Sequence, residues 1–157
     1  PTDKPILVLI GSPGQLPQLV RSISPAAALL MELFWPGPLT IVFPAAPDLS
    51  ALLTAGTGTI GVRYVPLPQL RRLLQHTGPL TGTSANRASE PPLDHAAAVQ
   101  GVLGEELELI LDGGPTPGGL PSTMVDARDR PHLIRAGVLE TDVIRTALAR
   151  QGYELSS

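Results

Sequence analysis

The chain has 157 residues, of which 43% are hydrophobic and 16% charged, with a formal net charge of −3 and no cysteine. This composition is typical of a folded protein with a sizeable core and argues against a wholly basic nucleic-acid-binding protein. The lack of cysteine excludes disulfides, thiolate metal sites and a thiol nucleophile. No stretch has the length of a membrane span or the pattern of a signal peptide, so a cytoplasmic protein with no membrane partner is the default expectation.

The first half of the chain alternates apolar runs with amphipathic segments, and prolines and glycines stand at the joints. The expected elements are a strand over 6–10, a short helix over 16–23, a helix over 26–34 with Ser24 as N-cap, strands over 39–43 and 59–64 separated by a loop over 44–58, and a helix over 67–76 with Gly78 at its C-cap.

The second half continues this alternation and ends in a pair of short strands. The expected elements are a strand over 80–83, a helix over 96–103 capped by Asp94, a strand over 107–111, a hairpin of strands over 123–126 and 132–135, and a helix from the cap Thr141 to about Arg150. The sequence therefore predicts one α/β domain over 1–157, with a twisted mixed parallel and antiparallel sheet, flanking helices and a concave ligand cleft.

Residues 81–86 (Thr-Gly-Thr-Ser-Ala-Asn) follow one of these strands and are rich in small hydroxyl and amide side chains. Such residues beyond a strand end line anion and nucleotide crevices in α/β proteins, although a simple polar turn has the same composition. Ser84 lies in no Gly-x-Ser-x-Gly elbow, and the chain has no phosphate-binding Gly-x-x-x-x-Gly-Lys-Ser/Thr loop. The Ser84 hydroxyl and the Asn86 amide are better interpreted as hydrogen-bond donors to a phosphate or carboxylate.

Two arginines, Arg63 and Arg135, stand at or near the ends of predicted strands. An arginine in this position either reaches out to water or binds a carboxylate or phosphate with its forked guanidinium. Asp112, ahead of two glycines, is either a metal ligand or a turn residue, and the turn is preferred. His76, His95 and His132 have no metal-ligand spacing, so no metal site is expected.

Six short motifs follow one another in order: residues 35–40 (Trp-Pro-Gly-Pro-Leu-Thr), 61–63 (Gly-Val-Arg), 84–86 (Ser-Ala-Asn), 112–114 (Asp-Gly-Gly), 122–126 (Ser-Thr leading to Asp), and 133–137 (Leu-Ile-Arg before Gly). In their order and spacing they resemble the YrdC-like family of threonylcarbamoyl-AMP synthases. The resemblance extends from Asp3 to about Gly137.

This resemblance implies an enzyme that joins L-threonine, bicarbonate and ATP, with Mg²⁺, into threonylcarbamoyl-adenylate and releases pyrophosphate. The product serves the modification of certain tRNAs, which makes tRNA or double-stranded RNA a partner to consider. Residues implied to contact ATP are Lys4, Thr59, Ser84, Asn86, Pro92 and Arg135. Residues implied to hold threonine are Arg63, through the substrate carboxylate, Gly82 and Ser122. No protein nucleophile is implied, since nucleotidyl transfer mainly needs positioning and charge neutralisation.

The chain departs from the family pattern in three places. The Lys-x-Arg motif and the threonine-binding segment that family members carry upstream of Lys4 do not occur, Leu9 stands where many members have histidine, and Leu120-Pro121 replaces a Val-Glu. We therefore expect the 157 residues to be truncated at the front, and to fold with little or no synthase activity. Two alternatives remain open from the sequence: a non-catalytic module that binds nucleotide or double-stranded RNA, and a carbamoyl-adenylate-forming domain like that of hydrogenase maturation carbamoyltransferases.

Overall fold

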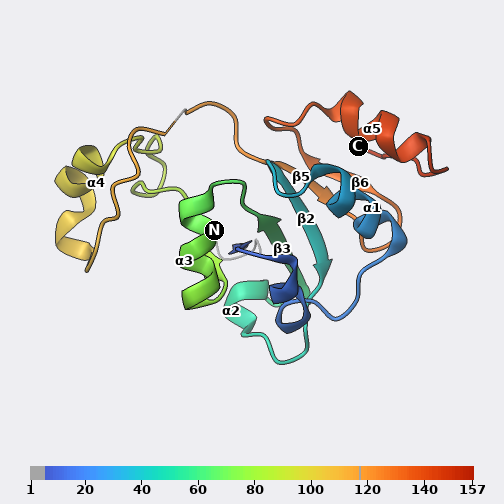
Figure 1. Ribbon diagram of the computed structural model, residues 1–157, viewed down its shortest axis with the longest axis horizontal. Helices are drawn as coiled ribbons and strands as arrows, with labels where there is room; N and C mark the ends of the chain where they lie inside the picture. Colours follow the sequence, from blue (N-terminus) through green and yellow to red (C-terminus); the bar gives the residue numbers. More distant parts are fainter. Residues whose placement is uncertain (1–5, 117) are drawn as a thin grey trace. The chain divides into compact units, whose positions relative to one another are not determined.

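The computed structural model describes residues 6–116 and 118–157, which group into two compact units (Figure 1). The larger unit comprises residues 1–82 and 121–157, and the smaller unit residues 83–120. The larger unit contains β1 (Leu7–Ile10), η1 (Pro13–Gln18), α1 (Pro25–Phe34), β2 (Leu39–Pro44), α2 (Ala51–Thr54), β3 (Thr59–Tyr64), α3 (Pro68–Thr77), β4 (Leu80–Thr81), β5 (Thr123–Asp126), β6 (His132–Arg135) and α5 (Thr141–Ala149). The smaller unit contains α4 (Ala96–Leu103) and the 3₁₀ turn η2 (Gly104–Glu106). A single domain over 1–157 stays a prediction.

The strands of the larger unit form one six-stranded sheet in the order β4-β1-β3-β2-β5-β6. Strands β1 and β3 pair in parallel, as do β2 and β5, whereas the pairs β1–β4, β2–β3 and β5–β6 are antiparallel. This mixed sheet with flanking helices confirms the predicted fold class. The predicted hairpin over 123–126 and 132–135 is confirmed as β5 and β6.

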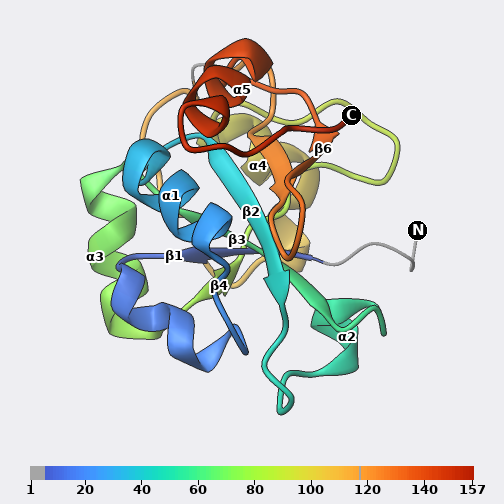
Figure 2. The same cartoon turned by 90° about the vertical axis from the view of Figure 1, so that its right-hand side faces the viewer.

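The core lies on one face of the sheet, beneath α1 and α5 (Figure 2). Side chains alternate between the faces of a strand, so Ile41, Val62 and Val125 all point into this core and are completely buried. The two helices add buried residues from their inner sides: Ala27 and Leu30 from α1, and Ile144 and Leu148 from α5.

Helix α1 begins as the sequence predicts. Ser24 is its N-cap and accepts a hydrogen bond from Ala27 N at 3.0 Å, and Pro25 occupies the first helical position. The Ser24 hydroxyl also donates to Ala127 O. One side chain therefore starts the helix and ties it to the segment after β5.

At the end of β5, Asp126 forms an ion pair with Arg128, and the closest nitrogen and oxygen lie 2.7 Å apart. Partial burial acts to raise the pKa of the Asp126 carboxyl, but the hydrogen bonds and positive charge of Arg128 outweigh it and hold the pKa below its usual value. The carboxylate therefore stabilises the folded state in its ionised form.

Two expectations in the first half need correction. The short helix predicted over 16–23 is wrong: a 3₁₀ turn spans Pro13–Gln18, and Val20 already forms a bridge to Ala45. Pro17 lies in that turn and has no N–H to donate, which disfavours an α-helix there. The loop predicted over 44–58 contains the short helix α2, capped by Ser50, which accepts from Leu52 N at 3.2 Å.

Three further expectations in the second half are wrong. Residues 107–111 form no strand, and Leu109 and Leu111 are exposed. An apolar run makes a strand only where a neighbouring strand is available to pair. Asp94 does not cap α4; the N-cap position is His95, whose ring lies against the Asp94 carboxylate. Thr141 is the first residue of α5 and not its cap.

Candidate functional site

The opposite face of the same sheet carries polar side chains among apolar ones, and we call it the polar face. Leu9 of β1 pairs with Arg63 of β3, and Leu7 pairs with Gly61, so these residues share one face. Thr40 of β2 also lies on this face, since a Cβ placed on Gly61 would come 3.4 Å from the Thr40 methyl. The β2–β5 and β5–β6 ladders continue the row through Met124 to Arg135. Residues far apart in the sequence thus carry hydroxyl and guanidinium groups to one surface.

Arg63 is the central cation of this face. Its Nε donates to Gly37 O at 2.9 Å, and Gly37 N in turn donates to Tyr64 O at 3.0 Å, so the Gly37 loop and the end of β3 hold each other. Burial lowers the pKa of the Arg63 guanidinium below its ordinary value, though arginine stays protonated at any physiological pH. Among the residues that the structure describes, no carboxylate forms an ion pair with Arg63, and its terminal Nη groups make no hydrogen bond. A partly desolvated cation without a counter-ion is suited to an anionic ligand.

Ser122, just before β5, lies at the centre of a second cluster. Its Oγ lies 2.8 Å from Thr40 Oγ1, and both side chains are buried. Arg135 donates to Ser122 O from Nη2 at 2.9 Å and from Nε at 3.3 Å, with a longer contact of 3.4 Å from Nη2 to Ser122 Oγ. Two of the three guanidinium nitrogens of Arg135, Nε and Nη2, therefore bind the Ser122 turn. These bonds do not test the prediction that Arg135 contacts ATP.

A close approach of two backbones fixes the position of this turn. A Cβ built on Gly137 would lie 2.2 Å from Pro121 O and 2.6 Å from Ser122 C, so only glycine fits. The next residue, Val138, donates its N–H to Pro121 O at 2.9 Å, and Thr123 N donates to Pro38 O at 3.0 Å. These contacts hold the Ser122 backbone between β2 and the segment after β6.

Two other expected site residues belong to the same unit. A Cβ on Gly82 would lie 2.7 Å from Leu9 Cγ, so Leu9 packs directly over this glycine. Thr59 is buried at the start of β3, and its hydroxyl hydrogen-bonds with that of Thr57 at 2.7 Å. Lys4 lies outside the described residues.

The remaining expected ligands of ATP, Ser84, Asn86 and Pro92, belong to the smaller unit. Ser84 and Pro92 are exposed. Asn86 donates from Nδ2 to the carbonyl oxygens of Arg87 and Glu90, both at 2.9 Å, and its Oδ1 is buried without a hydrogen-bond partner among the described residues. Both amide hydrogens therefore close the local turn, and Oδ1 remains a buried acceptor that no described residue satisfies. That Ser84 and Arg135 line one cleft stays a prediction, as does the cleft itself.

Acidic and histidine side chains do not gather at this face. Asp112 Oδ1 accepts from Gly114 N at 2.9 Å, which is the turn interpretation preferred from the sequence. Within the described ranges, no group of three or more His, Cys, Asp or Glu side chains could hold a metal ion. The donor set of the polar face, guanidinium and hydroxyl, suits an anion and does not suit a metal cation held by the protein.

No role was predicted for Thr40, Gly37 or Gly137, although Gly37 and Thr40 lie in the motif over 35–40 and Gly137 ends the motif over 133–137. Thr40 lies 82 positions from Ser122, so no local pattern could have revealed their contact. The signal that was available is the presence of a threonine and two small residues directly beside expected ligand-binding positions.

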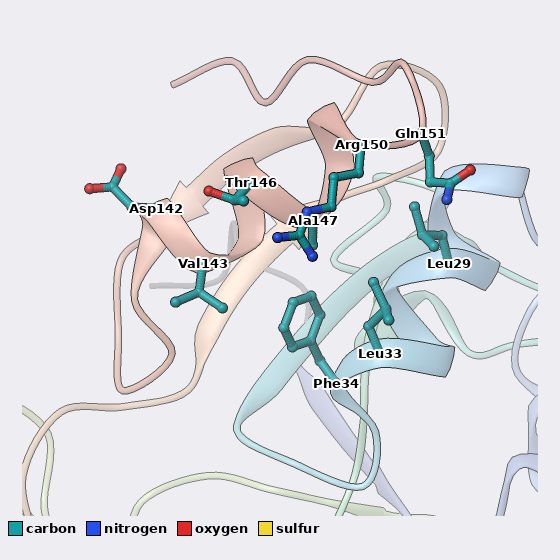
Figure 3. A pocket seen from close by; sticks show the side chains of 9 residues that line it. All are labelled: Leu29, Leu33, Phe34, Asp142, Val143, Thr146, Ala147, Arg150 and Gln151. Carbon is teal, nitrogen blue, oxygen red and sulfur yellow. The ribbon is translucent and has the colours of Figure 1, made fainter.

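An apolar groove of about 620 Å³ lies between α1 and α5 (Figure 3). Its walls come from Leu29, Leu33 and Phe34 of α1 and, among others, Val143 and Arg150 of the α5 region. None of the expected site residues lines it, because these helices cover the core face of the sheet and not the polar face. Within the described part of the chain, no helix is long and apolar enough to cross a membrane.

Comparison with known proteins shows one family to which the chain is similar. A family model described as telomere recombination, Sua5/YciO/YrdC, matches residues 1–137. The threonylcarbamoyl-AMP synthase of Bacillus subtilis (strain 168) is 36% identical over 151 residues, covering 94% of this chain and 44% of that protein. The protein of the same name from Vibrio vulnificus (strain YJ016) is 35% identical over 140 residues, covering 87% and 75%.

Solved structures agree with the sequence comparisons. The Pyrococcus abyssi Sua5 protein complexed with L-threonine superimposes with a TM-score of 0.88 at 31% identity, covering 99% of this chain and 46% of that one. Escherichia coli YciO superimposes with a TM-score of 0.77 at 25% identity, covering 88% and 68%. The chain thus spans less than half the length of the Bacillus and Pyrococcus relatives.

Proposed function

Because this chain belongs to the Sua5/YciO/YrdC family, we propose that it carries the substrate-binding face of a threonylcarbamoyl-AMP synthase. The observation that carries the proposal is Arg63, a partly buried guanidinium whose two Nη groups have neither a carboxylate nor another hydrogen-bond acceptor among the residues that the structure describes. The fork of these two groups matches a carboxylate, and L-threonine brings one.

The reaction proceeds in two steps that need no protein nucleophile. The amine of L-threonine forms a bond to the carbon of bicarbonate and water leaves, giving a carbamate. A carbamate oxygen then attacks the α-phosphorus of ATP and displaces pyrophosphate. All three substrates carry negative charge, so the protein accelerates the reaction by holding them together and neutralising that charge.

Arg63, Ser122 and Gly82 are proposed to hold threonine. Arg63 binds the carboxylate, and Ser122, fixed by its backbone contacts, supplies a hydroxyl on the same face. Gly82 has no side chain and Leu9 packs directly against it, so only its backbone is available to the ligand.

Lys4, Thr59, Ser84, Asn86, Pro92 and Arg135 are proposed to contact ATP. The protein hydrogen bonds of Arg135 use Nε and Nη2 on Ser122, so Nη1 is the group that meets a phosphate. Mg²⁺ enters as the metal complex of the nucleotide, held by phosphate oxygens. A product destined for tRNA fits the cytoplasmic location expected from the sequence.

Release of pyrophosphate tests the proposal. The complete gene product containing these residues is incubated with MgATP, L-threonine and bicarbonate, and each substrate is omitted in turn. Pyrophosphate that appears only with all three supports the synthase. Pyrophosphate release that does not depend on threonine contradicts the proposal. The absence of pyrophosphate release together with salt-sensitive binding of duplex RNA also contradicts it and favours the RNA-binding alternative.

A further inference from the structure

The contact between Thr40 and Ser122 bears on which of the two hydroxyl groups can donate a hydrogen bond to a ligand. Thr40 is 0% exposed and Ser122 is 6% exposed, so of these two buried residues only Ser122 reaches the surface at all. The Thr40 methyl packs toward Gly61 on the β3 side, and its hydroxyl turns to the β5 side, where it meets Ser122 Oγ at 2.8 Å. Packing therefore holds Thr40 in one rotamer.

The hydrogen between these two oxygens can belong to either residue, and burial decides between the two arrangements. If Ser122 donates to Thr40, the Thr40 proton has no other acceptor among the described residues, and a buried hydroxyl without an acceptor is costly. If Thr40 donates to Ser122, the Thr40 proton is satisfied and the Ser122 proton is left to point elsewhere.

Arg135 favours the second arrangement. A guanidinium can only donate, and Arg135 Nη2 approaches Ser122 Oγ at 3.4 Å in addition to its shorter bond to Ser122 O. Ser122 Oγ thus faces donors on two sides within the protein. Its own O–H is then free to point away from both donors.

We infer that Thr40 is a positioning residue that makes Ser122 a directed hydrogen-bond donor to an acceptor oxygen of the substrate. The inference rests on the proposed function and deepens it, because it predicts the chemistry that this position selects. With Arg63 on the same face, the site takes the carboxylate of an amino acid in preference to the neutral amide of the same amino acid.

The first experiment needs no ligand. Thr40 and Ser122 hydroxyl protons are observed by NMR in the free protein, and the Thr40 signal is assigned by its loss in Thr40→Val. We expect a slowly exchanging Thr40 proton, because it is buried and bonded, and a Ser122 proton that exchanges quickly with water. A protected Ser122 proton beside a fast Thr40 proton would overturn the inference whatever the protein binds.

The second experiment uses calorimetry of L-threonine and L-threoninamide binding to the complete gene product. Thr40→Val keeps the shape of the side chain and removes the donor, so we expect threonine affinity to fall about three- to tenfold while the preference over the amide shrinks. Thr40→Ser keeps the hydroxyl and is expected to stay within about twofold of the wild type. The unfolding midpoint of each variant serves as the control for folding.

The double variant separates positioning from mere packing. In a Ser122→Ala background, Thr40→Val should cause no further loss, because the group that Thr40 orients is already gone. An equal loss in both backgrounds, or an unchanged affinity in Thr40→Val, overturns the inference while the synthase assignment stands. If the wild type binds no threonine, the proposed function fails, and the NMR experiment alone decides the proton direction.

Discussion

Gly137→Ala is the sharpest test of the geometry around Ser122. The three atoms nearest to the new Cβ are Pro121 O at 2.2 Å, Ser122 C at 2.6 Å and Thr123 N at 2.6 Å, and all of them are backbone. No flexible side chain can move aside, so one strand end has to shift by roughly 0.8–1 Å. Such a shift strains the bonds that Val138 N and Thr123 N make at 2.9 and 3.0 Å.

The cost can be estimated from these contacts. Overpacking typically costs about 1–3 kcal/mol, and each weakened backbone hydrogen bond adds roughly 0.5–1.5 kcal/mol. We therefore expect Gly137→Ala to lower the free energy of unfolding by about 2–6 kcal/mol, or roughly 4–24 °C in the unfolding midpoint of a chain of this size.

The matched control is the same substitution at Gly101 in α4, where a Cβ meets nothing within 4 Å. Alanine is the better helix former, so Gly101→Ala should leave stability unchanged or raise it by about 0.5–1 kcal/mol. Thermal unfolding followed by circular dichroism measures both. If Gly137→Ala unfolds at the wild-type temperature, the backbones do not approach each other as described, and the positioning of Ser122 by this segment is refuted.

Three other variants test separate contacts. Arg63→Lys keeps the charge but loses the forked guanidinium and the Nε bond to the Gly37 loop, so threonine affinity measured by calorimetry should fall about 10- to 100-fold. The control is Arg72→Lys at an exposed position, which should not change that affinity. Equal affinities of Arg63→Lys and the wild type would exclude Arg63 as the carboxylate ligand. The pKa of Asp126 is lower in the folded than in the unfolded state, so its carboxylate stabilises the folded state above the unfolded pKa, and this stabilisation is lost as the pH falls through the folded pKa. Urea titrations should therefore show Asp126→Asn less stable than the wild type at pH 7, with the difference shrinking below about pH 4. Gly82→Ala should destabilise the chain by pressing on Leu9, and less so in a Leu9→Ala background; additive effects in thermal unfolding would contradict that contact.

The sequence by itself determined most of the local structure, because local structure depends on neighbouring residues. The Ser24-Pro25 pair specifies the start of α1 through a cap and a fixed φ angle. The run over 59–64 specifies β3 through its apolar and β-branched residues, with Arg63 near its end. The order of short motifs was also enough to identify the family, because that order can be read directly along the chain and does not depend on tertiary contacts.

Partners across the sheet were decided only by the tertiary structure. Residues 107–111 are mostly apolar, as in a buried strand, yet such a run cannot show whether a neighbouring strand is there to pair, and none pairs with them in the described chain. Thr40, Ser122 and Gly137 come from three separate segments, and their contacts arise from the register of β2, β5 and β6. From residue type alone, these three positions would be predicted only as turn or strand residues. Register sets the direction in which each hydroxyl points, because a shift of one residue would turn Thr40 into the core and leave Ser122 without its donor.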